Sequence, residues 1–78
     1  MNKLNQTAGS FEIYGDSDTL YFEHVLHGED RAICIYLDEQ TQDVVDYDMA
    51  ACIPDQVGRW LEDNGYNVQK EDGFWDII

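Results

Sequence analysis

The carboxylate side chains are the groups of this chain best suited to binding a metal ion, yet they complete no metal-binding pattern. Asp16-Ser17-Asp18 matches the start of a calcium-binding loop. Such a loop continues with a further oxygen ligand, an invariant Gly and a Glu at position twelve. Leu20 and Tyr21 stand where the ligand and the Gly belong. We therefore expect no dedicated metal site in this segment, and at most adventitious binding of divalent cations.

The histidines and cysteines form no recognisable site either. His24 and His27 are spaced so that a continuing strand would place them on opposite sides, and no cysteine pair lies near them. Cys34 and Cys52 are far apart in the chain and belong to no Cys-x-x-Cys motif, so we expect two buried free thiols. The sequence predicts no catalytic residue, no metal and no cofactor, and we interpret the protein as a non-enzyme.

The charge of the chain points to a class of partner. There are 17 Asp and Glu against 4 Lys and Arg, giving a net charge of −13 at pH 7. Binding of phosphates needs clustered Lys and Arg, so this balance excludes an ordinary nucleic-acid-binding domain and docking on anionic lipid. The acidity is consistent with a role in solubility or in a salty environment alone. As a binding surface it predicts a basic protein as the partner, and a basic cleft that normally holds DNA or RNA is the commonest large basic surface.

Length and composition predict one folded domain. The chain has 78 residues, 44% hydrophobic and 13% aromatic, which is too apolar for a disordered chain. Residues 1–9 are polar and weakly patterned, so we expect a flexible N-terminal arm before a single domain at 10–78. The N-terminus has no apolar signal region, and no run reaches the roughly 18–20 apolar residues of a membrane span. We expect a cytoplasmic protein, in the host cell cytoplasm if a phage encodes it.

Short apolar runs separated by acidic turns predict an antiparallel sheet. Ile53, Val57, Trp60 and Leu61 recur at helical spacing and predict a helix over about 53–64. Pro54 fits its first turn, and Gly65 fits its C-terminal cap. The predicted strands are 11–14, 19–26, 31–37 and 44–48 before the helix, and 66–70 and 74–78 after it. This order, β-β-β-β-α-β-β, is the α+β class with one helix packed on a face of the sheet.

Alternation along the strands separates a core face from an outer face. The core face carries Phe11, Ile13, Leu20, Phe22, Leu26, Ile33, Ile35 and Leu37, under Val57, Trp60 and Leu61 of the helix. The outer face carries Tyr14, Tyr21 and Tyr36 with Glu12, Glu23, Val25, Cys34 and Asp46. Tyrosines also pair across strands to stabilise a solvated face. Three of them on one face, however, favour a protein interface, where tyrosine is enriched.

Most remaining carboxylates of the predicted sheet fall in turns, which a meander would gather at its two ends. Asp16, Asp18, Asp38, Glu39 and Asp43 would form one acidic rim, and Glu29, Asp30 and Asp48 the opposite one. Asp16/Asp18 and Asp46/Asp48 also have the spacing of alternate strand residues. That spacing is about 6.6–6.8 Å, similar to the distance between successive phosphates of a nucleic-acid strand. These residues are therefore candidates to occupy phosphate positions in a basic cleft.

In size, charge and its combination of aromatic and acidic residues, the whole chain resembles the small acidic DNA mimics. These include many anti-restriction and anti-CRISPR proteins carried by phages, and no sequence motif aligns with them. The resemblance implies an inhibitor that fills the nucleic-acid site of a host enzyme or defence complex, such as a CRISPR effector or a restriction enzyme.

The alternative function is a protein-interaction adaptor, or an immunity or antitoxin-like module. In that case Tyr14, Tyr21 and Tyr36 carry the affinity, and the acids set specificity and association rate. Under either function, an exposed terminal strand is able to pair with a second copy and form a homodimer.

Overall fold

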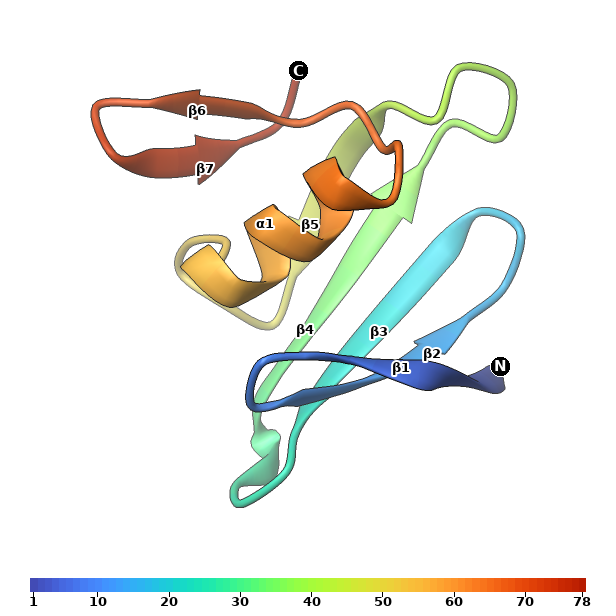
Figure 1. Ribbon diagram of the computed structural model, residues 1–78, viewed down its shortest axis with the longest axis vertical. Helices are drawn as coiled ribbons and strands as arrows, with labels where there is room; N and C mark the ends of the chain where they lie inside the picture. Colours follow the sequence, from blue (N-terminus) through green and yellow to red (C-terminus); the bar gives the residue numbers. More distant parts are fainter.

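The computed structural model describes all 78 residues and places them in one sheet, one helix and one separate hairpin (Figure 1). The sheet is antiparallel and follows chain order: β1 (Asn2–Ala8), β2 (Phe11–Gly15), β3 (Thr19–His24), β4 (Gly28–Leu37) and β5 (Val44–Asp48). Helix α1 (Asp55–Asp63) packs on one face, and β6 (Gln69–Glu71) pairs with β7 (Phe74–Asp76). The α+β class and the order of the predicted elements are confirmed.

The N-terminal segment is a strand, so the prediction of a flexible arm over 1–9 was wrong. Lys3 pairs with Tyr14 and Ala8 with Phe11 of β2. The Trp60 indole of α1 also donates a hydrogen bond to Gln6 Oε1 at 3.2 Å. An edge strand packs only one side on the core, and here Leu4 and Ala8 are its apolar members on that side. Two such residues among polar neighbours do not distinguish a strand from an arm in the sequence.

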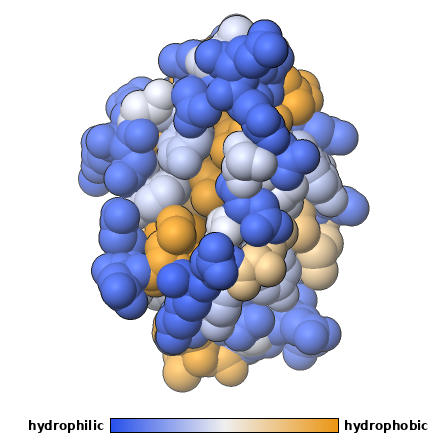
Figure 2. Space-filling view, turned by 90° about the vertical axis from the view of Figure 1, so that its right-hand side faces the viewer, coloured by the Kyte–Doolittle hydropathy of each residue, from blue (hydrophilic) through white to orange (hydrophobic).

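The core lies between the sheet and the helix and follows the predicted alternation, with one exception. The buried cluster contains Ala8, Phe11, Ile13, Leu20, Phe22, Ile33, Ile35, Leu37, Val44, Ile53, Val57, Trp60, Leu61 and Trp75. Leu26, predicted in the core, is 82% exposed, and Val25 is 55% exposed. Strand β3 ends at His24, before both residues, so they form the tip of the β3–β4 hairpin. Apolar atoms accordingly show at the lower end of the molecule in Figure 2, where Figure 1 places this hairpin.

Helix α1 is shorter at its start than predicted and ends as predicted. It begins at Asp55, with Pro54 as the N-cap rather than in the first turn. At the other end Gly65 has a φ of +85°, a conformation that favours glycine. The Gly65 N–H donates to Glu62 O and the Tyr66 N–H to Leu61 O, which is the Schellman pattern. The helix therefore ends where the sequence indicated, and for the expected reason.

The C-terminal hairpin packs against α1 through Trp75 of β7 and Lys70 of β6. Its Trp75 is 5% exposed and lies over Gly58, and its indole N–H donates to Asp55 Oδ1 at 2.8 Å. Lys70 Nζ lies 3.6 Å from the same carboxylate oxygen and 5.1 Å from the centroid of the Trp75 ring. An isolated two-stranded hairpin is at best marginally stable in water, so β6 and β7 depend on these contacts.

Replacing Gly58 should destabilise the protein although the position is helical. A Cβ at Gly58 would overlap the Trp75 indole. Helix propensity alone would favour Gly58→Ala by about 1 kcal/mol, whereas overpacking costs about 1–3 kcal/mol. We expect a lower free energy of unfolding in urea. The matched control is Glu62→Ala, exposed on the same helix, which should stay within about 0.5 kcal/mol of the wild type. A Gly58→Ala variant more stable than the wild type would contradict this packing.

The Asp55 carboxylate should contribute stability that acid removes. The Trp75 hydrogen bond, aided by the nearby Lys70 and Arg59, holds the pKa of Asp55 below its usual value. Its contribution is therefore present above the pKa of the unfolded chain, about 3.9, and is lost as pH falls through the lower folded pKa. Asparagine resembles the protonated acid. We expect Asp55→Asn to be less stable than the wild type at neutral pH, with the difference shrinking in acid.

Urea unfolding followed by tryptophan fluorescence at several pH values measures this difference. Asp63→Asn is the control, because Asp63 lies on the same helix without a hydrogen bond or an ion pair. A difference between Asp55→Asn and the wild type that did not change with pH would contradict the assignment.

Candidate protein-binding surface

The tyrosines lie together on the face of the sheet opposite α1. Tyr14 is paired with Tyr21, Tyr21 with Cys34, and Cys34 with Asp48, in a row across β2, β3, β4 and β5. The rings of Tyr14 and Tyr21 have centroids 6.0 Å apart. The pairing places Tyr14, Tyr21 and Cys34 of the predicted outer face side by side, whereas Val25 lies beyond the end of β3. No other element covers this face, because the helix and the C-terminal hairpin lie on the other side (Figure 1).

Acidic side chains surround these rings. Tyr36 is paired with Asp46 in the next row, and Glu12 with Glu23 in the row on the far side of Tyr14 and Tyr21. Asp46 and Asp48 are both exposed and, as alternate residues of β5, point to the same side of the sheet. We call Tyr14, Tyr21, Tyr36, Glu12, Glu23, Asp46 and Asp48 the tyrosine face. It offers aromatic area enclosed by negative charge.

The phenols of Tyr21 and Tyr36 stay protonated at neutral pH. Burial, followed by nearby Glu23 and Glu29, raises the pKa of Tyr21. The Cys34 thiol, then burial and Asp48, raise the pKa of Tyr36. Both hydroxyls are therefore neutral groups that can donate hydrogen bonds, placed next to carboxylates that can only accept them.

The acidic rim predicted from the first and third turns is also brought together. The Ser17 hydroxyl donates to Glu39 Oε1 at 2.8 Å, and the Leu37 N–H donates to Asp18 O at 2.8 Å, so the two turns are in contact. We call Asp16, Asp18, Asp38, Glu39 and Asp43 the first rim. It adjoins the tyrosine face, since Tyr14 and Tyr36 are each one residue from the end of their strands at this edge.

Two carboxylates of the first rim have local structural tasks. Asp38 Oδ1 accepts hydrogen bonds from the N–H groups of Gln40 and Thr41, at 2.8 and 3.2 Å. Asp43 Oδ1 accepts one from the Asn67 side chain at 2.8 Å. Turns are rich in Asp for this kind of local bond. Asp18 Oδ1 and Glu39 Oε1 accept hydrogen bonds only from the hydroxyls of Thr19 and Ser17, at 3.2 and 2.8 Å, so these two residues and Asp16 are more available to a partner.

The second predicted rim is only partly formed. Glu29 and Asp30 lie near the start of β4 at the hairpin, whereas Asp48 is opposite Cys34 and belongs to the tyrosine face. The phosphate-like spacing holds for Asp46 and Asp48, which are in a strand. It was wrong for Asp16 and Asp18, because both lie in the turn after β2, where strand spacing does not apply.

Sequence reasoning missed Lys3 on this surface. It faces Tyr14 from β1, and its Nζ lies 3.6 Å from Glu12 Oε1, so one carboxylate of the tyrosine face is partly neutralised. With only Leu4 and Ala8 as apolar members of β1, the sequence carried too weak a signal to place Lys3 beside Tyr14. The outer edge of β1 pairs with no further strand, and homodimerisation through a strand edge stays a prediction.

The negative charge of the molecule is almost entirely uncompensated within the chain. Of the 17 carboxylate side chains, only Glu12 and Asp55 lie within 4.0 Å of a Lys or Arg nitrogen. No charged side chain is buried, so the remaining carboxylates meet solvent. Charges of one sign on so small a body repel one another, which lowers stability and attracts basic partners.

Salt should therefore stabilise the free protein. We expect the Tm to rise by roughly 2–8 °C between low salt and a few tenths molar NaCl, because added ions screen the repulsion. A variant with Asp16→Asn, Asp18→Asn and Glu39→Gln should melt higher at low salt and respond less to NaCl. Differential scanning calorimetry makes both measurements, and a Tm that is independent of salt in both proteins would contradict the expectation.

The thiols are free, as expected, but they are not buried. Cys34 is half-buried on the sheet, with its Sγ 3.5 Å from Met49 Sδ, and Cys52 is exposed. No group of three or more His, Cys, Asp or Glu side chains is arranged to hold a metal ion. The only helix has nine residues and is too short to be a membrane-spanning segment.

Comparisons with known proteins identify no relative: no protein-family model, no curated protein and no solved structure matches this chain.

Proposed function

We propose that this protein is an acidic inhibitor that covers the basic surface of a nucleic-acid-binding enzyme or defence complex. The observation that carries the proposal is the scarcity of internal ion pairs, with only two of 17 carboxylates paired, around a sheet face that no helix covers. Carboxylates of the first rim and the tyrosine face would stand where phosphates bind. Nucleic acid would then be excluded from the partner, which the inhibitor would meet in the cytoplasm.

Both parts of the surface suit a partner that binds phosphates. Such a partner offers Lys and Arg, and carboxylates accept charge-assisted hydrogen bonds from them. Arginine side chains also stack on aromatic rings, and the tyrosine face presents three phenols beside carboxylates. Because negative charge is spread over both parts of this surface, association with a basic partner should be fast and strongly dependent on salt.

A second candidate function is a protein-interaction adaptor, or an immunity or antitoxin-like module. The observation that favours it is the adjacency of Tyr14 and Tyr21, whose rings are 6.0 Å apart. Paired aromatic side chains supply rigid area of the kind that dominates many interfaces. Under this function the tyrosines carry most of the affinity, and salt changes it little.

Charge reversal in the first rim should distinguish the two functions. The full chain, tagged, is used to capture partners from a bacterial lysate and is eluted in steps of rising salt. We expect a nucleic-acid-binding protein that leaves at moderate salt and that DNA displaces. Asp16→Lys, Asp18→Lys and Glu39→Lys together should lower its affinity by about a hundredfold or more. Asp38 is left intact because its carboxylate holds the β4–β5 turn.

The matched control is Glu62→Lys, Asp63→Lys and Glu71→Lys, which makes the same change of net charge on α1 and β6. It should reduce binding far less than the rim variant. Equal losses in both variants would mean that only net charge matters and would contradict a defined surface. Binding that resists salt, survives the rim variant and is lost in Tyr14→Ala with Tyr36→Ala would favour the adaptor.

A further inference from the structure

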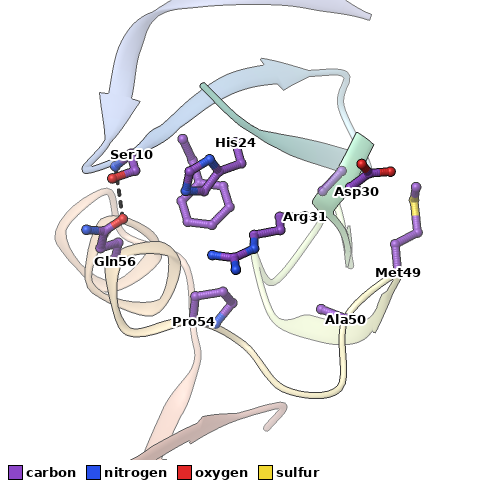
Figure 3. Close-up of a pocket in the computed structure, with 10 residues that line it drawn as sticks. Ser10, His24, Asp30, Arg31, Met49, Ala50, Pro54 and Gln56 are labelled. Atoms are coloured by element: carbon purple, nitrogen blue, oxygen red, sulfur yellow. Dashed lines mark hydrogen bonds between the residues drawn. The ribbon is translucent and has the colours of Figure 1, made fainter. Parts of the chain in front are cut away.

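A pocket of about 470 Å³ lies between one end of the sheet and the start of α1 (Figure 3). Its walls come from the first residues of β2, the end of β3, the start of β4, the segment after β5 and the beginning of α1. Small-molecule sites commonly measure about 300–1,000 Å³, so this cavity has room for a small organic ligand.

Arg31 is the residue that makes this pocket unusual. Lys3, Arg59 and Lys70 each lie within 4.0 Å of a carboxylate, whereas Arg31 has no such partner in a chain with 17 acidic residues. In Figure 3 its guanidinium extends toward His24 and Pro54, and the Asp30 carboxylate points away on the side of Met49. The one unpaired guanidinium of a strongly acidic protein is thus directed into a cavity.

His24 adds a second donor beside Arg31. Its Nδ1 accepts hydrogen bonds from the N–H groups of Leu26 and His27, at 3.1 and 3.3 Å. A neutral imidazole with Nδ1 as acceptor carries its proton on Nε2, which makes no hydrogen bond within the protein. Burial, then His27 and Arg31, lower the pKa of His24, so the ring is neutral near pH 7. An anion bound here would favour the charged ring and raise that pKa.

The remaining walls are partly polar, from Ser10, Asp30 and Gln56, and partly apolar. The Phe11 ring meets the His24 ring edge to face, with centroids 5.3 Å apart, and Met49, Ala50 and Pro54 also line the pocket. Guanidinium recognises carboxylate through two parallel hydrogen bonds, while apolar walls select a ligand with a hydrocarbon or aromatic body.

We propose that this pocket binds a small organic carboxylate, with Arg31 and His24 Nε2 donating to its oxygens and Phe11, Met49 and Pro54 packing against its apolar body. The two donors, Arg31 and His24, lie on the helix side of the sheet, whereas Met49 at the edge of the pocket also contacts Cys34 in the row of Tyr21. The net charge of −13 and the nearby Asp30 oppose an anion, and salt screens the more distant charges. We expect dissociation constants of about 0.1–5 mM for simple probes.

Nuclear magnetic resonance on the full chain tests this proposal with sodium benzoate as the probe and sodium acetate as the probe without an apolar body. Benzoate should shift the His24 ring signals and the Arg31 amide, and should raise the pKa of His24. Arg31→Gln should weaken benzoate binding by about tenfold or more, because it removes a charge-assisted contact. Arg59→Gln is the matched control, since it removes the same charge outside the pocket, and should bind like the wild type.

Three results would overturn the proposal. One is the absence of shifts at His24 and Arg31 with about 20 mM benzoate, well above the expected dissociation constants. Another is equal binding by Arg31→Gln and Arg59→Gln, which would show that the Arg31 guanidinium is not the recognition group. The third is acetate binding as tightly as benzoate, which would remove the role of the apolar walls. Amide spectra of each variant establish that it is folded.

Discussion

The five-stranded sheet has a single helix to cover it, and this constraint organises the rest of the molecule. Only one face of the sheet can be buried, so the aliphatic and phenylalanine side chains of β2, β3 and β4 lie under Trp60 and Leu61. The other face must be acceptable to water and still support pairing between strands. Tyrosines meet both needs, because the ring packs across strands while the hydroxyl stays hydrated. The same residues thereby become available to a partner.

Because the core lies on one face of the sheet only, all the charged side chains remain at the surface. With no charged side chain buried, folding requires no desolvated ion pair, and the carboxylates contribute repulsion that the small core must outweigh. A bound basic partner would relieve that repulsion. The free protein carries the cost of this repulsion, which is the physical basis for proposing an inhibitor of a basic protein.

The one Lys or Arg side chain without an ion pair lies away from the tyrosine face and the first rim, although unpaired carboxylates occur on both sides of the sheet. The tyrosine face and first rim leave carboxylates free, whereas the pocket near α1 leaves Arg31 and the Nε2–H of His24 free. The separation matters because Arg31 beside the first rim would find a carboxylate partner and lose its availability. The fold keeps them apart by placing them on opposite faces and at opposite ends of the strands.

The sequence by itself determined the class of fold, the helix end at Gly65, the two faces of β2, β3 and β4, and the excess of negative charge. The fold class, the helix end and the two faces follow from periodicity and turn chemistry, which involve only a few neighbouring residues. The excess of negative charge follows from the composition of the chain. Tertiary structure alone decided that residues 2–8 form β1, that Leu26 is exposed, and that Trp75 docks on Gly58. It also decided which carboxylates are free and that Arg31 faces a pocket, because ion pairing and cavities depend on residues far apart in the chain.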